Sequence, residues 1–354
     1  MKVIIITEFL SHYRIPFYNH LSKFGRVELT VAHTEIGQIN RIYEFQQLCY
    51  EKSTFRNLFF YASNSELYKK VKESDVIICM FNLRFLDLYK CLYVINKPVV
   101  LWGIGLSSND GLGKKNLIFD YLRVLAAKRA KALILYSKIP FSFYLKNNIN
   151  NEKLFCANNT ILWTPIPDFS NIKVNFIFIG TLYKKKRVDL LIKSVKQLHG
   201  EGFQSANLII VGNGEEKGKL ENLVLEIGLD KSVFFLGEIN NEVDLQAIYN
   251  KALLCISPGQ AGLTVLQSMA AGVTFVTSKD AITGGEIDTI ENGVNGIVYD
   301  GSLSTLYEIM KDSLINPSKY IEMGKAARLK YETEFTLDTM VNNFMKCLEY
   351  AIEN

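Results

Sequence analysis

Residues 252–276, ALLCISPGQAGLTVLQSMAAGVTFV, contain a strand, a glycine-containing loop and a helix in direct succession. The run Ala252–Ile256 is apolar without alternation, which predicts a short buried strand. Residues 257–259, Ser-Pro-Gly, break this strand, and helical spacing follows at Leu263, Leu266 and Ala270. Gly272 is expected to end the helix, because glycine is common just after a helix C-terminus, and Val273–Val276 begins another strand. This order is typical of a parallel α/β sheet.

The same stretch predicts an anion site at the start of the helix, near Leu263. The first backbone N–H groups of a helix lack partners within the helix, and the helix dipole places about half a positive charge there. Phosphate groups are common ligands of such sites. An ordinary turn between a strand and a helix explains the stretch equally well. The residues of the other loops are needed to distinguish an anion site from such a turn.

Length and composition indicate two globular domains. The chain has 354 residues, and 48% of them are hydrophobic. At about 150 residues per domain, two domains are expected. No apolar run reaches the ~18 residues of a membrane-spanning helix. The opening sequence, MKVIIITEFLSHYRIP, has an apolar stretch too short for a signal peptide, so we expect a cytoplasmic protein.

Motifs for metals and disulfides are missing from the sequence. The cysteines form no CxxC pair, the histidines form no HExxH motif, and no Asp-x-Asp occurs. We therefore expect core cysteines in a reducing compartment and no metal dependence. The net charge is only +4, and no nucleic-acid partner is expected. Basic residues cluster in the first half, at Lys69, Lys70, Lys72, Lys114, Lys115, Arg123, Lys128, Arg129 and Lys131.

Strand and helix patterns alternate twice along the chain, which predicts two doubly wound Rossmann-like α/β domains. The first domain is expected at residues 1–160, an Asn- and Pro-containing linker at 161–174, and the second domain at 175–335. Residues 336–354 form an amphipathic helix that we expect to cross back to the first domain. The predicted strands are Val3–Thr7, Val27–Ala32, Val76–Phe81, Val99–Trp102, Ala132–Ser137, Asn175–Ile179, Leu208–Val211, Val233–Leu236, Ala252–Ile256 and Gly296–Tyr299.

The loops after the strands of the second domain contain glycine and positive charge. In an open α/β sheet, ligands bind at the carboxyl ends of the strands, and here we expect the ligand in a cleft between the two domains. Residues 184–187 read Lys-Lys-Lys-Arg, which suits a diphosphate, although a solvated basic turn has the same composition. The segment Gly212–Gly218 lacks the third glycine of GxGxxG, and no GxxxxGK[ST] occurs, so neither a dinucleotide enzyme nor a P-loop nucleotidase is indicated.

Taken in order, these segments resemble the GT-B glycosyltransferases of the group 1 (family 4) class. The similar segments of the second half are FIGTLYKKKRVDLLI, LIIVGNGEEKGKLENL, VFFLG, SPGQAGLTVLQSMAAGVTFVTS and GGEIDTIENGVNGIVY. In the first half they are ITEFLSHYRIPFYNHL, LAAKRAKALILYS and NNTI. The resemblance covers nearly the whole chain. It implies a GT-B fold that binds a nucleotide-diphosphate sugar as co-substrate, without a metal or other cofactor.

The resemblance also implies roles for individual residues. Lys186 corresponds to the lysine that contacts the donor diphosphate, and with Arg187 it would stabilise the leaving group. Gln267 stands where the class usually has a ribose-binding glutamate. The residues expected to bind the donor are Gly180, Thr181, Lys186, Gly212, Gly214, Glu238, Ile239, Gly259, Gln260, Ala261, Gly262, Leu263, Thr264 and Gln267. Those expected on the acceptor side are His12, Tyr13 and Arg14.

The sequence departs from the class at three expected donor positions. The usual Glu-x7-Glu pair is replaced by Gly259 and Gln267, and the arginine that commonly follows the first glycine is Thr181. We interpret the chain as a divergent member that transfers a sugar with retention, in the synthesis of a bacterial surface polysaccharide. The alternatives are a nucleotide-sugar epimerase or hydrolase on the same fold and a non-catalytic nucleotide-sugar-binding protein.

The acceptor is expected to be a saccharide or a lipid-linked saccharide. The segment Leu117–Ala130 mixes apolar residues with Arg123, Lys128 and Arg129, a pattern that allows peripheral contact with an anionic membrane. A helix packed on the core with one solvated face is the simpler interpretation of the same pattern.

Overall fold

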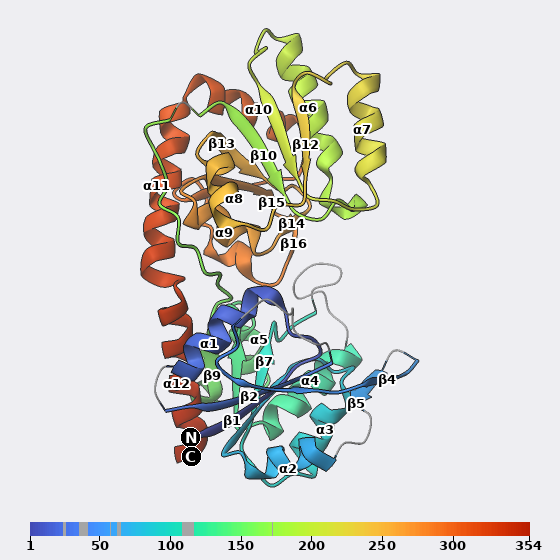
Figure 1. The fold of residues 1–354 in the computed structure, drawn as a ribbon, viewed down its shortest axis with the longest axis vertical. Coiled ribbons are helices and arrows are strands. Elements are labelled where there is room, and N and C mark those ends of the chain that lie inside the picture. The colour runs from blue at the N-terminus through green and yellow to red at the C-terminus, as the bar shows by residue number, and fades with distance from the viewer. Residues whose placement is uncertain (24–25, 35–41, 57, 62–64, 108–116, 172) are drawn as a thin grey trace. The chain divides into compact units, whose positions relative to one another are not determined.

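Apolar strands form a parallel sheet in each of the two units of the chain (Figure 1). The computed structural model describes residues 1–354 except 24–25, 35–41, 57, 62–64, 108–116 and 172. Unit 1 comprises Met1–Leu162 and Thr336–Asn354, and unit 2 comprises Trp163–Phe335. Both chain ends therefore belong to unit 1.

The described residues of unit 1 form a seven-stranded parallel sheet in the order β3-β2-β1-β6-β7-β8-β9. Its strands are β1 (Lys2–Ile6), β2 (Glu28–His33), β3 (Gln46–Cys49), β6 (Val76–Met80), β7 (Val99–Gly103), β8 (Ala132–Leu135) and β9 (Leu154–Cys156). An antiparallel hairpin, β4 (Lys52–Phe55) with β5 (Leu58–Tyr61), is separate from this sheet. The helices are α1 (Ile15–Lys23), α2 (Ser65–Glu73), α3 (Leu86–Tyr93), α4 (Leu117–Arg129), α5 (Phe141–Lys146) and α12 (Leu337–Glu353), with 3₁₀ turns η1 (His12–Arg14) and η2 (Asn151–Lys153).

Helix α12 completes the core of unit 1, although it follows unit 2 in the sequence. The ring of Phe344 lies 4.8 Å from Phe17 of α1 and 4.9 Å from Trp102 of β7, centroid to centroid. His20 on α1 meets Asp338 on α12 at 2.5 Å. The last helix therefore packs on the first unit.

The described residues of unit 2 form a six-stranded parallel sheet in the order β12-β11-β10-β13-β15-β17. Its strands are β10 (Asn175–Ile179), β11 (Asn207–Val211), β12 (Val233–Gly237), β13 (Ala252–Ile256), β15 (Thr274–Ser278) and β17 (Gly296–Tyr299), and the short β14 (Gln260–Ala261) pairs with β16 (Ile282–Thr283). The helices are α6 (Val188–Gly200), α7 (Lys217–Glu226), α8 (Glu242–Tyr249), α9 (Thr264–Ala270), α10 (Leu303–Ile315) and α11 (Pro317–Glu334), with 3₁₀ turns η3 (Lys184–Lys186) and η4 (Glu286–Thr289).

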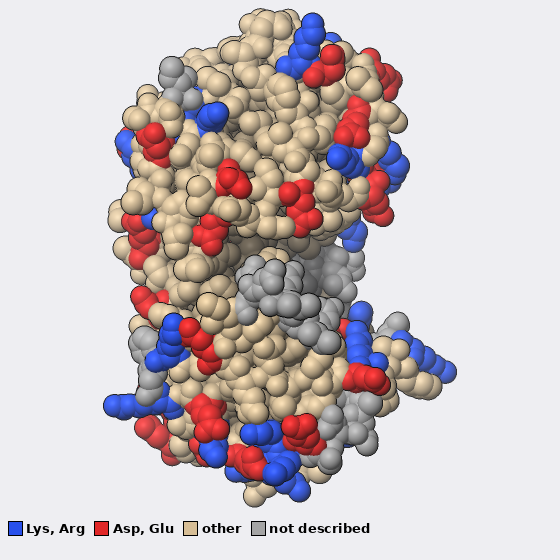
Figure 2. Space-filling view, viewed as in Figure 1, with Lys and Arg blue, Asp and Glu red and all other residues tan. Residues whose placement is uncertain are grey.

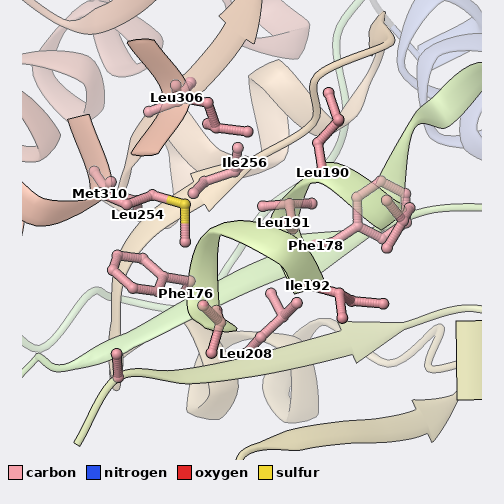
Figure 3. Close-up of a cluster of buried hydrophobic side chains, with 14 of the residues drawn as sticks. Phe176, Phe178, Leu190, Leu191, Ile192, Leu208, Leu254, Ile256, Leu306 and Met310 are labelled. Atoms are coloured by element: carbon pink, nitrogen blue, oxygen red, sulfur yellow. The ribbon is translucent and has the colours of Figure 1, made fainter. Parts of the chain in front are cut away.

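One part of the core of unit 2 lies between the sheet and the helices α6 and α10. Figure 3 shows Phe176 and Phe178 of β10 and Leu254 and Ile256 of β13 meeting side chains of α6 and α10. All four are buried, because both faces of a central parallel strand are covered. The buried centre of the sheet supports the loops at its carboxyl edge.

The predicted fold class is confirmed, and several element bounds need correction. The helix predicted from Leu263 begins at Thr264, the strand predicted to reach Ser137 ends at Leu135, and the basic loop contains the turn η3. Of the predicted basic clusters, Lys70 and Arg123 form ion pairs with Glu73 and Asp120. Lys114 and Lys115 lie outside the described residues. On the face shown in Figure 2, basic and acidic side chains are interspersed.

Candidate functional site

Four neighbouring strands of unit 2 end in loops that hydrogen-bond to one another. The order β12-β11-β10-β13 places the loops that follow these strands side by side at the carboxyl edge. The N–H of Gly180, after β10, donates to the carbonyl of Val211 at 2.9 Å, and the N–H of Gly212, after β11, donates to that of Gly237 at 2.7 Å. The structure thus brings together the predicted glycine loops.

Glycine at two of these positions allows the loops to touch. A β-carbon built on Gly212, whose φ is +138°, would lie 2.0 Å from the carbonyl oxygen of Gly180. A β-carbon built on Gly214 would lie 2.2 Å from that of Leu182. Both distances are far below van der Waals contact, so the sequence needs glycine here for close approach of backbone to backbone.

Lys186 places a buried ammonium group at the centre of this edge. Its side chain is 8% exposed, and a β-carbon built on Gly180 would lie 3.1 Å from its Nζ. The Nζ lies 5.5 Å from the ring centroid of Tyr183 and 5.9 Å from that of Phe178, and no ion pair of Lys186 occurs among the described residues. Burial lowers the pKa of Lys186 to about 8, because the charged form loses hydration without gaining a counter-charge. The site therefore favours an anionic ligand.

Arg187 points to a different part of the sheet edge. Its backbone adopts a left-handed conformation (φ 57°) between η3 and α6. A β-carbon built on Gly301, beyond β17, would lie 3.9 Å from Nη1 of Arg187. The structure thus places the two predicted leaving-group residues apart, with Lys186 beside Gly180 and Arg187 beside Gly301. Thr181, the residue after Gly180, is exposed.

The loop after β13 packs directly on the basic loop. The N–H of Gly259 donates to the carbonyl of Lys186 at 3.2 Å, and the N–H of Ile282 donates to that of Gly259 at 3.0 Å. A β-carbon built on Gly259 would lie 1.7 Å from the carbonyl oxygen of Lys185. No side chain fits at position 259 without movement of this backbone. This close packing explains why position 259 has no carboxylate side chain.

Gln260 and Tyr183 form a side-chain pair that sequence reasoning missed. The Tyr183 hydroxyl donates to Oε1 of Gln260 at 2.7 Å, and both side chains are half-buried. Ala261 is buried beside them in β14. The two residues are 77 positions apart, so no local pattern in the sequence could reveal the pair.

Helix α9 has only seven residues, so the predicted effect of its dipole is weaker than that of a long helix. Thr264 at its start donates from Oγ1 to the carbonyl of Ile179 at 3.3 Å, which ties the helix to the end of β10. Leu263 is the N-cap residue and has no side-chain cap. Gln267 follows Leu263 by four positions, lies on the same helix face and is half-buried.

The loop after β12 carries the residues predicted to hold the nucleobase. Glu238 is exposed and Ile239 is half-buried. Oε1 of Glu238 accepts a hydrogen bond from Asn240 at 3.1 Å. This loop adjoins the Gly212 loop, since Gly237 accepts from the N–H of Gly212.

The residues predicted on the acceptor side form the turn η1 in unit 1, directly before α1. His12 is exposed and contacts Tyr13 edge to face, at 5.9 Å between ring centroids. The guanidinium of Arg14 lies 4.3 Å from the ring centroid of Trp102 and donates to the hydroxyl of Tyr136. Arg14 is thus held between aromatic side chains, whereas His12 meets solvent.

The described part of the chain holds neither a metal-ligand cluster nor a membrane-spanning helix. No group of three or more His, Cys, Asp or Glu side chains is arranged there to hold a metal ion. No helix among those residues is both long and apolar enough to cross a membrane.

Comparison with known proteins identifies a family. The family model described as glycosyl transferases group 1 matches residues 167–330. A glycosyltransferase of Haemophilus influenzae is 31% identical over 282 residues, which are 77% of this chain and 76% of that protein. The N-acetyl-α-D-glucosaminyl L-malate synthase of Bacillus anthracis is 26% identical over 173 residues, 48% of this chain and 43% of that enzyme.

The fold is shared over a longer span than these sequence matches. The structure of Anabaena HepE in complex with UDP-glucose matches 99% of this chain and 99% of its own, with a TM-score of 0.75 and 17% sequence identity. Some matched relatives are aligned over much less than their full length, only 30% for a Methanocaldococcus jannaschii glycosyltransferase that is 32% identical over 34% of this chain. At 17% sequence identity, the structural match shows that the fold is shared.

Proposed function

Since the chain belongs to the group 1 glycosyltransferases, we propose that it transfers a sugar from a nucleotide-diphosphate sugar to an acceptor hydroxyl with retention of configuration. The observation that carries this proposal is the buried Lys186, whose Nζ lies beside Gly180 without an anionic partner among the described residues. A diphosphate would supply the missing counter-charge. UDP-glucose in the complex of HepE supports a donor of this class.

The loops at this sheet edge offer a place for each group of such a donor. Neighbouring strands lie about 4.8 Å apart, so the loops after β12 and β13 are separated by about 14 Å along the sheet edge. We propose the nucleobase at Glu238 and Ile239, the ribose at Gln267, the diphosphate at Gly180 and Lys186, and the sugar at residues 259–264. The neighbouring loop packs on the backbone of Gly180 and Leu182, because Gly212 and Gly214 have no side chains.

Lys186 would act on the leaving group. As the bond from the sugar to the diphosphate breaks, negative charge grows on the diphosphate, and a positive group fixed in advance stabilises that charge best. A desolvated ammonium interacts more strongly than one in water. We propose that the diphosphate itself assists removal of the proton from the acceptor hydroxyl. Transfer then needs no metal and no carboxylate base from this loop.

We further propose that the product belongs to a bacterial surface polysaccharide, such as a capsule, O-antigen or exopolysaccharide. An O-antigen biosynthesis glycosyltransferase of Escherichia coli, 28% identical over 38% of this chain, supports this context. The reaction would take place in the cytoplasm, where residues His12 to Arg14 would contact a saccharide or lipid-linked saccharide acceptor. An epimerase or hydrolase would turn over the nucleotide sugar without an acceptor, and a binding protein would not turn it over at all.

One surface of unit 1 supports contact with an anionic membrane. Leu117, Ile118 and Tyr121, in the first turns of α4, are 82%, 74% and 64% exposed. The second half of the helix packs through Val124, Ala126 and Ala127 and carries exposed Lys128 and Arg129. Exposed apolar side chains with cations on the same helix are typical of interfacial binding. The wild type should sediment with phosphatidylglycerol vesicles, and the variant with both Leu117 and Ile118 changed to Ser should stay in solution. Absence of binding by the wild type at low salt would refute the contact.

The donor proposal is tested by thermal unfolding with UDP, GDP, CDP and ADP, with and without EDTA. One nucleotide at hundredfold excess over its Kd should stabilise the protein by about 2.7 kcal/mol, independently of EDTA. Lys186→Ala should remove most of this stabilisation and slow sugar transfer. Lys196→Ala, which removes an exposed lysine of α6, is the matched control and should behave as wild type. If none of the four nucleotides stabilises the protein, the proposal fails.

A further inference from the structure

We propose that Gln260 recognises a hydroxyl group of the transferred sugar and that Tyr183 is its positioning residue. This inference rests on the proposed function, since it assigns a role within the same donor site. At the preceding position, Gly259, the structure leaves no space for a side chain.

Position 259 has no space for a side chain. A β-carbon there would lie 1.7 Å from the carbonyl oxygen of Lys185, and the N–H of Gly259 is bonded to the carbonyl of Lys186. The basic loop therefore occupies the volume that a carboxylate would need. A side chain of this loop that hydrogen-bonds to the sugar therefore has to stand at a neighbouring position.

Gln260 is the next residue, and its backbone is fixed. Strand β14, Gln260–Ala261, pairs with β16, Ile282–Thr283. The Tyr183 hydroxyl donates to Oε1 of Gln260 at 2.7 Å, which sets the rotation of the amide. Its Nε2 then has two N–H groups and no hydrogen-bond partner among the described residues. A β-carbon built on Gly262 would lie 3.8 Å from Nε2, so the amide lies over the loop proposed to hold the sugar.

Tyr183 links this amide to the proposed diphosphate contact. Its ring centroid lies 5.5 Å from Nζ of Lys186, while its hydroxyl holds Gln260. One tyrosine thus contacts both the cation and the amide. The free N–H groups of Gln260 are therefore placed next to the expected position of the phosphate, where the first sugar ring of a donor has to lie.

The chemistry differs from that of a carboxylate. A carboxylate only accepts hydrogen bonds, whereas Nε2 of glutamine only donates them. The sugar hydroxyl that meets Gln260 would therefore act as an acceptor at this contact. Because the amide is neutral, this recognition should not change with pH between 6 and 9.

The test compares the nucleotide with its sugar conjugate, using UDP with UDP-glucose and GDP with GDP-mannose. Tyr183→Phe keeps the ring beside Lys186 but removes the hydroxyl, and Gln260→Ala removes the amide. Each variant should weaken binding of the sugar conjugate roughly tenfold relative to the nucleotide alone, the size expected for one hydrogen bond. Donor KM should rise more than kcat falls.

A deoxy-sugar series separates recognition from a structural role. The wild type should lose affinity for the donor that lacks one particular hydroxyl, and Gln260→Ala should show no further loss with that donor. Equal weakening of nucleotide and conjugate in both variants, with folding unchanged by circular dichroism, would overturn the inference. Failure of the wild type to bind any of the nucleotides would instead refute the proposed function, so the two failures are distinguishable.

Discussion

At Gly259 a single hydrogen atom in place of a side chain allows two loops to pack. We predict that Gly259→Ala lowers the free energy of unfolding of unit 2 by roughly 1–3 kcal/mol, because the new methyl group would press on the Lys185 carbonyl. The same displacement would move Lys186 and weaken nucleotide binding. Urea unfolding and nucleotide titration measure the two effects.

Gly262→Ala is the matched control in the same loop. Only Nε2 of Gln260, at 3.8 Å, would lie near its new β-carbon, which is ordinary contact. Its stability should stay within about 0.5 kcal/mol of the wild type. Equal destabilisation by both substitutions would show that the packing of Gly259 on the basic loop is not special.

The ionisation of Lys186 gives nucleotide binding a predicted pH dependence. Burial lowers its pKa to about 8 in the free protein, and a bound diphosphate would raise it, because opposite charge favours the ammonium form. Binding should therefore be tightest below pH 8 and weaken as the pH rises above it, by up to about tenfold per unit. Calorimetric titrations at pH 7.5, 8.5 and 9.5 measure this slope. The slope should flatten in Lys186→Ala, and a flat wild-type profile would contradict the assignment.

Among the elements, α12 makes the clearest energetic prediction. Phe344 is fully buried against Phe17 and Trp102, and removal of such a ring leaves a cavity. Phe344→Ala should destabilise unit 1 by about 3–5 kcal/mol. The fluorescence of Trp102 should change with it, because the ring contact is lost.

Ile352→Ala on the same helix provides the control. Its side chain is 46% exposed, so little burial is lost and the effect should stay below about 1 kcal/mol. If Phe344→Ala were as mild as Ile352→Ala, α12 would not be an integral part of the core of unit 1.

For the whole molecule, two buried lysines predict how stability varies with pH. Burial lowers the pKa of both Lys173 and Lys186 to about 8, below the usual 10.5 of lysine. Between these values the unfolded chain binds more protons than the folded chain, so the stability of unit 2 should rise as the pH increases from about 8. Burial raises the pKa of Tyr299 to about 12, which opposes this rise above about pH 10.

Chemical unfolding at pH 7.5 and 9.5 checks this prediction. The wild type should need more denaturant at pH 9.5. Lys173→Met, which replaces a side chain that is 6% exposed by an uncharged one, should be more stable at pH 7.5 and gain less on going to pH 9.5. An equal gain in the two proteins would exclude Lys173 as a source of the effect.

The strands and their class follow from local sequence. Continuous apolar runs predict β10 and β13 with the bounds that the structure has, because a strand buried on both faces needs such a run. The small strand predicted at Gly296–Tyr299 is β17, with the same bounds. Helix α8 was missed although Asn241 caps it, with its side chain accepting from the N–H groups of Val243 and Asp244. That signal was present in the sequence. The hairpin β4–β5 was missed because β4 is mostly exposed and has no continuous apolar run.

By itself, the sequence predicted two doubly wound sheets, an amphipathic last helix and glycine and lysine loops at the carboxyl edge, since periodicity and the order of elements along the chain are local properties. Only the tertiary structure decided which side chains meet. It placed Lys186 beside Gly180 but Arg187 beside Gly301, it closed position 259 with the Lys185 carbonyl, and it paired Tyr183 with Gln260. Such contacts join loops that are distant along the chain, and their geometry depends on packing of the whole sheet, which no local pattern contains.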